Sequence, residues 1–84
     1  MTIKTILTPG IAKRMNEENA FNDFVIGCIY RHLSGDWGEV PEDDALLNRS
    51  DPMYAISAYT SSDGVKIWLK QDYKILTVMF PSEY

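Results

Sequence analysis

The chain is poor in the residues that carry most protein chemistry, with one cysteine and one histidine in 84 residues. A single cysteine, Cys28, excludes an internal disulfide and favours a reducing, cytoplasmic compartment. One histidine with scattered carboxylates makes a poor metal site, and there is no glycine-rich phosphate loop or serine nucleophile motif. We therefore expect no metal, no cofactor and no catalysis. No apolar run approaches the roughly 18 residues of a membrane span, so we expect a soluble protein.

Basic residues are also scarce: 8 Lys and Arg stand against 12 Asp and Glu, and the net charge is -4. The basic residues do not cluster, so direct nucleic-acid binding is not expected. The carboxylates do cluster, and a solvated loop with a helix start would account for them. A second interpretation is an acidic face that docks on a basic protein surface. The candidate partner-binding carboxylates are Asp36, Glu39, Glu42, Asp43 and Asp44.

The length and apolar content fit one domain over residues 1–84. Ile3 to Leu7 are typical of a short strand, and Thr8 and Pro9 provide an N-cap and a first helical residue for a brief helix. The strongest periodic signal follows it, because Phe21, Phe24, Val25, Cys28 and Ile29 have the spacing of an amphipathic helix that ends near Leu33. Gly27 inside this helix suggests a close backbone neighbour.

A third short helix opens at Pro41 and stops before Asp51-Pro52. The rest of the chain is rich in β-branched and aromatic residues and predicts a three-stranded antiparallel meander. The last strand is apolar on both faces, so we expect it inside the sheet with the N-terminal strand beside it. The fold class is α+β, with two or three helices packed on one face of the sheet. The three predicted strands are Met53 to Thr60, Val65 to Lys70 and Ile75 to Phe80.

The run from Arg31 to Gly38 concentrates unusual residues. Gly35 and Gly38 bracket Asp36-Trp37 and predict a well-defined corner, because glycine is favoured in tight turns and at positive φ. His32 is interpreted as a structural residue of this corner. The alternative is acid-base chemistry with Asp36, in a small enzyme or a ligand-binding domain.

Aromatic residues supply a second candidate interface. Trp37, Tyr59 and Trp68 could form an exposed aromatic surface of the kind that anchors protein partners. A core or cross-strand role is the alternative for each of them.

Several of these pieces together resemble a family of small bacterial proteins encoded on plasmids and phages. The resemblance rests on the Arg-His-x-x-Gly-Asp-Trp-Gly corner at residues 31–38 and on the Phe-Pro-x-Glu-Tyr ending at residues 80–84. It also includes Thr8-Pro9-Gly10, an acidic pair before Asn48, Ser57-Ala58-Tyr59 and Ile67-Trp68. Typical members carry Thr-Glu-x-Asp-Arg between the last two strands, where this chain has Lys70-Gln71-Asp72-Tyr73-Lys74.

The resemblance implies no enzyme activity and no cofactor. It implies an accessory gene of a mobile element, and small acidic proteins of that origin commonly block host defence machinery such as CRISPR effectors and restriction enzymes. We therefore expect a non-catalytic inhibitor whose partner is a host protein or nucleoprotein complex with a basic surface. The alternatives are the small enzyme or ligand-binding domain that uses His32 and Asp36, and a plasmid or phage maintenance module that homodimerises through an exposed strand.

Overall fold

The computed structural model describes residues 2–84 and contains three α-helices and one four-stranded sheet. The α+β class is confirmed. Short 3-10 turns at Pro52–Tyr54 and Pro81–Glu83 precede β2 and follow β4. The elements are β1 (Lys4–Leu7), α1 (Pro9–Glu17), α2 (Asn19–Leu33), α3 (Glu42–Ser50), β2 (Ile56–Thr60), β3 (Lys66–Asp72) and β4 (Ile75–Met79).

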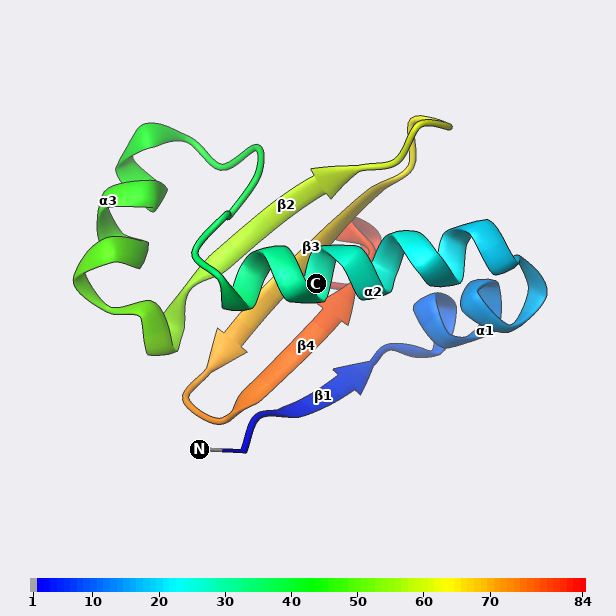
Figure 1. The fold of residues 1–84 in the computed structure, drawn as a ribbon, viewed down its shortest axis with the longest axis horizontal. Helices are drawn as coiled ribbons and strands as arrows, with labels where there is room; N and C mark the ends of the chain where they lie inside the picture. Colours follow the sequence, from blue (N-terminus) through cyan, green and yellow to red (C-terminus); the bar gives the residue numbers. More distant parts are fainter. Residues whose placement is uncertain (1) are drawn as a thin grey trace.

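The sheet has the strand order β1-β4-β3-β2 (Figure 1). Strands β2, β3 and β4 form the expected antiparallel meander, and β4 lies inside the sheet with β1 beside it. β1 runs parallel to β4, so the sheet is mixed rather than purely antiparallel. The parallel direction follows from the path of the chain, because the three helices between β1 and the meander allow a crossover instead of a hairpin.

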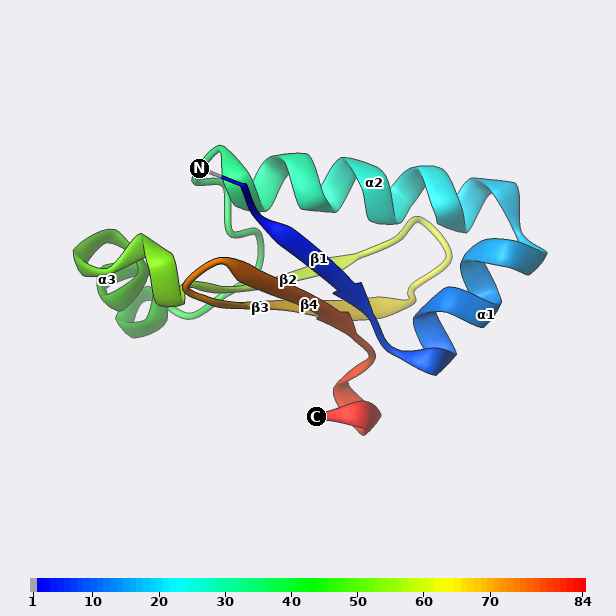
Figure 2. The ribbon, with the colours of Figure 1, turned by 90° about the horizontal axis from the view of Figure 1, so that it is seen from below.

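Helix α2 covers one face of the sheet, and Figure 2 shows it lying above the strands. Its buried residues are Phe21, Val25, Cys28 and His32, which extends the predicted apolar stripe by one turn. They pack on Ile67, Leu69, Leu76 and Val78 from the sheet and on Ile11 from α1. Gly27 is exposed and no atom lies within 4 Å of the position a Cβ would take, so the predicted close backbone neighbour is wrong. Within residues 2–84, no helix has the length and apolar composition needed to cross a bilayer.

The start of α1 is tied to the end of the chain. Thr8 occupies the N-cap position, but its hydroxyl donates to Glu83 Oε1 at 2.6 Å instead of bonding the first turn of the helix. The Gly10 N–H donates to Glu83 Oε2 at 3.0 Å, so the glutamate caps the helix. The side-chain hydrogen bond from Thr8, followed by the backbone bonds from Phe80 and Gly10, lowers the pKa of Glu83.

Candidate functional site

The negative charge of the chain is concentrated at one end of the molecule, here called the acidic end and defined as residues 34–51. This segment holds six carboxylates and one arginine, whereas the remaining residues hold six carboxylates and seven cations. The acidic end comprises the corner after α2 and the whole of α3, which lies beyond the end of the sheet beside β2 (Figure 1). The five candidate carboxylates all belong to this segment, with Asp36 and Glu39 in the corner and Glu42, Asp43 and Asp44 in the first turn of α3.

The corner is held by specific contacts. Gly35 and Gly38 both adopt positive φ, at 88° and 69°. Between them, the Asp36 carboxylate accepts a hydrogen bond from Arg31 Nε at 2.7 Å and one from the Gly38 N–H at 3.2 Å. These bonds lower the pKa of Asp36, and the bond from Arg31 is the larger cause. Asp36 is thus partly neutralised by Arg31, and its main contribution is to fix the corner.

The same corner closes the outer edge of β2. The Glu39 N–H donates to the Ala58 carbonyl at 2.8 Å, and the Ala58 N–H donates to the Trp37 carbonyl at 3.2 Å. In the last turn of α3, Asn48 binds both backbone groups of Ile56 through its amide, with Nδ2 to O at 2.8 Å and N to Oδ1 at 3.1 Å. A loop and one side-chain amide therefore take the place of a neighbouring strand.

Helix α3 has mostly exposed residues. Asn48 is its one buried residue, whereas Leu46 and Leu47 are 51% and 67% exposed. Glu42 pairs with Arg49 at 3.4 Å, and Asp43 and Asp44 complete an acidic first turn that suits the helix dipole. Apolar side chains surrounded by carboxylates have the composition of a protein-binding surface with an apolar centre and a polar rim.

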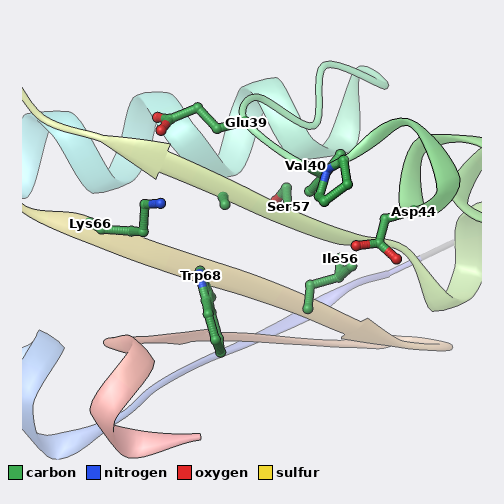
Figure 3. Close-up of a pocket in the computed structure, with 9 residues that line it drawn as sticks. Glu39, Val40, Asp44, Ile56, Ser57, Lys66 and Trp68 are labelled. Atoms are coloured by element: carbon green, nitrogen blue, oxygen red, sulfur yellow. The ribbon is translucent and has the colours of Figure 1, made fainter.

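A groove of about 410 Å³ runs between the acidic end and the uncovered face of the sheet (Figure 3). Val40 and Pro41 form one wall, and Trp68 with Ala58 lines the sheet side. Charged side chains from both parts of the molecule line the groove, namely Glu39 and Asp44 from the acidic end and Lys66 from β3. The acidic end is thus continuous with an aromatic wall.

The three candidate aromatic residues do not form one exposed surface. Tyr59 is 1% exposed and lies in the core, so its assignment to an exposed surface is wrong. The Arg31 guanidinium lies 4.6 Å from the centre of its ring, and its hydroxyl donates to the Asp36 carbonyl at 2.6 Å. Burial raises the pKa of Tyr59 to about 12, which keeps this hydroxyl a donor. Tyr59 therefore supports the corner from inside.

The two tryptophans are half-buried in different places. Trp68 lies on the uncovered face of the sheet, where its ring meets Tyr84 edge to face at 5.6 Å. Trp37 lines a separate hollow of about 550 Å³ together with His32 and Gln71. Trp68 thus lines the groove beside the acidic end, whereas Trp37 belongs to the acidic end but lines the other hollow.

His32 lies in a buried network that the sequence did not predict. Its Nδ1 is 2.7 Å from Ser57 Oγ, and its Nε2 is 3.0 Å from Gln71 Oε1. The amide nitrogen of Gln71 donates to the Tyr73 carbonyl at 2.9 Å, which leaves Gln71 Oε1 as an acceptor. Nε2 of His32 therefore carries the proton, and Nδ1 accepts from the Ser57 hydroxyl. Burial lowers the pKa of His32 and favours this neutral form.

The imidazole and Asp36 do not form the acid-base pair of the alternative interpretation. Both ring nitrogens of His32 are occupied by Ser57 and Gln71, while the Asp36 carboxylate binds Arg31. The hydroxyl beside the imidazole belongs to Ser57, which is fully buried. No buried side-chain polar atom among the described residues lacks a partner, and residues 2–84 contain no cluster of three metal-binding side chains. The network joins α2 to β2 and β3.

Periodicity could not have found this network, because Ser57 and Gln71 lie 25 and 39 residues away from His32. The one available signal was a polar residue at a core-facing position of each strand.

Comparison of the chain with protein-family models, curated proteins and solved structures finds no match.

Proposed function

We propose that the chain is a non-catalytic binding protein that inhibits a host defence nuclease complex of the CRISPR or restriction type. Its acidic end docks on the basic surface that the nuclease uses to hold nucleic acid. The observation that carries the proposal is the segregation of charge: residues 34–51 carry an excess of five negative charges, and the other residues carry one net positive charge.

Such a surface suits a nucleic-acid channel for a physical reason. Channels that hold DNA or a guide heteroduplex are lined with Lys and Arg that neutralise phosphates. A carboxylate-rich helix competes for the same cations, and long-range attraction speeds and orients the encounter. The class of partner also draws on the resemblance to proteins of plasmids and phages.

Apolar contacts supply the affinity that charge alone does not. Exposed ion pairs contribute little, about 0–1 kcal/mol each. Leu46 and Leu47 project from the same helix as Glu42, Asp43 and Asp44, and Tyr54 is 57% exposed in the turn that follows. We expect the leucines to be the centre of the contact and the carboxylates to be its rim.

The test uses two variants with equal net charge. The variant E42Q/D43N/D44N neutralises the first turn of α3, and E17Q/D23N/D63N neutralises three carboxylates outside the acidic end. Both are mixed with purified CRISPR effector complexes and restriction endonucleases, and binding and nucleic-acid cleavage are measured at low and at physiological salt. We expect about a tenfold or greater loss of affinity for the first variant and little change for the second.

Two outcomes would refute the proposal. One is the absence of a complex with any of these enzymes at low salt. The other is an equal loss of affinity in the two variants, since this would leave net charge, and not the acidic end, as the cause. Circular dichroism at 222 nm checks that α3 remains folded, because its first-turn carboxylates also stabilise the helix.

A further inference from the structure

The sheet has one closed edge and one free edge. At β2, the corner and Asn48 already occupy the outward backbone groups of Ala58 and Ile56. At the other end of the strand order lies β1, and within residues 2–84 no segment pairs with its outer side (Figure 1). Figure 2 shows the same side of β1 uncovered. The chain therefore protects one edge of its sheet and leaves the other available.

The free groups on β1 can be assigned. The Lys4 N–H donates to Lys74 O at 2.8 Å and the Thr8 N–H donates to Val78 O at 3.1 Å, so alternate residues from Lys4 onward face β4. In a parallel ladder the residues between them point their N–H and C=O groups to the opposite side. Within β1 these residues are Thr5 and Leu7, and the same alternation points the backbone groups of Ile3, just before the strand, to the outer side.

An apolar strip of α2 lies above this edge. At about 100° per residue, Ile26, Ile29 and Leu33 fall on one flank of the helix and Arg31 falls on the other. Arg31 lies over Tyr59 of β2, so the opposite flank faces β1. Leu33 lines the same hollow as Ile3. Ile26 and Leu33 are 42% and 49% exposed, and the strip carries no charged residue.

We propose that a second copy of this chain pairs with β1 in an antiparallel arrangement and continues the sheet across a two-fold axis. Side chains on one face must stay on that face across the pair, and residues with outward backbone groups must lie opposite one another. Both conditions are met with Thr5 opposite Thr5 on the axis, Ile3 opposite Leu7, and Lys4 opposite Ile6. The strips Ile26, Ile29 and Leu33 of the two copies then pack above the joined strands.

A second copy fits this surface better than a foreign strand for two reasons. A chain of net charge -4 repels its own copies, so self-association needs a surface with little charge. The apolar strip of α2 and strand β1 together contain one charged residue, Lys4. The pairing is also self-complementary, with Thr5 on the axis. Because β2 is closed by its own chain, the assembly stops at two copies and does not extend to a filament.

The test is sedimentation across a wide concentration range. Thr5→Pro removes an N–H that points away from β4, so the monomer keeps its own ladder while the joined edge loses a donor. Thr5→Val keeps that N–H and is the matched control. We expect a dimer for the unmodified chain and for Thr5→Val, and at least about a tenfold weaker dimer for Thr5→Pro.

Two further variants keep the test decisive if Thr5→Pro does not fold. Ile26→Glu places a charge on the exposed strip without touching β1, and we expect it to weaken the dimer as well. Thr5→Cys should form a disulfide between copies under mild oxidation, because residues opposite each other in a hydrogen-bonded antiparallel pair have Cα atoms about 5.5 Å apart. Ser62→Cys, at the exposed hairpin tip, is the control that should not.

A chain that stays monomeric up to about 1 mM overturns the proposal, and so does a dimer unaffected by both Thr5→Pro and Ile26→Glu. A monomer that binds a β-strand peptide at Thr5 would assign the edge to a foreign strand and also overturn it. These readouts do not involve a nuclease, so they are independent of the proposed function.

Discussion

Gly38 is the position where one added methyl group should disturb the acidic end most. Its φ of 69° is one that residues with a side chain rarely adopt. A Cβ there would overlap the Ala58 carbonyl oxygen and lie 2.6 Å from a ring carbon of Tyr59. The first of these neighbours is backbone in β2 and the second is a buried ring, so neither can move aside easily. In Gly38→Ala the corner must therefore separate from β2.

The magnitude follows from what is lost. Left-handed backbone costs an ordinary residue about 1 to 2 kcal/mol. Separation of the corner from β2 breaks the hydrogen bonds that join Ala58 to Trp37 and Glu39, at about 1 kcal/mol each. We expect Gly38→Ala to lower the free energy of unfolding by about 3 to 4 kcal/mol, a large share of the stability of a small domain.

Gly35 supplies the matched control. Its φ is 88°, but no atom lies within 4 Å of the Cβ position, so Gly35→Ala should lose only the backbone cost of about 1 to 2 kcal/mol. Urea unfolding followed by tryptophan fluorescence and by circular dichroism measures both variants. Equal losses for the two variants, or a loss below about 1 kcal/mol for Gly38→Ala, would refute the reasoning, because the clash with β2 would then have no effect.

Three other predictions concern titration and reactivity. Burial lowers the pKa of His32 below its unfolded value of 6.5. The contribution of this group to the free energy of unfolding is therefore full above pH 6.5 and is lost as the pH drops toward the folded pKa. Urea midpoints should fall over this pH range, and His32→Gln should abolish this dependence. Glu83→Gln should cost about 1 kcal/mol by weakening the cap on α1, measured by thermal unfolding at pH 7 with Ser82→Ala as control. Cys28 is buried with its pKa raised to about 11, so a thiol reagent at pH 8 should modify it only as fast as the protein opens; rapid labelling without denaturant would contradict the burial.

The elements of this fold were largely predictable because each is marked by its local spacing or by residues at its ends. The stripe from Phe21 to Ile29 gave α2, and the apolar run at 75–80 gave an inside strand that the structure confirms as β4. In β3, Ile67 and Leu69 alternate with Lys66 and Lys70, so its buried face was also evident. Local spacing carries this information because it depends only on neighbouring residues.

The facing of β2 was harder to predict. Its two alternating sets each mix apolar and small polar side chains, with Ser57 and Tyr59 on one face and Ile56, Ala58 and Thr60 on the other. Alternation alone therefore does not decide which set lies inside, and the prediction of an exposed Tyr59 is wrong for this reason. The same ambiguity hid Ser57 as a partner of His32. Contacts between residues far apart in sequence depend on the assembled sheet, and no single segment encodes them.

The two proposed surfaces lie at opposite edges of the sheet, so the two proposals together lead to one prediction. The acidic end lies beside β2, whereas the proposed dimer forms at β1, so pairing leaves both acidic ends free and pointing away from each other. A dimer could then hold two basic surfaces at once and gain avidity without any new contact at either one. Thr5→Pro should keep the affinity of a single acidic end for an isolated nuclease but lose that gain on a target that presents two sites. E42Q/D43N/D44N should lose both, because it removes the contact itself. The decisive measurement is binding to a surface densely coated with the target. If Thr5→Pro and the unmodified chain bind this surface equally, the dimer adds no avidity and the acidic end acts alone.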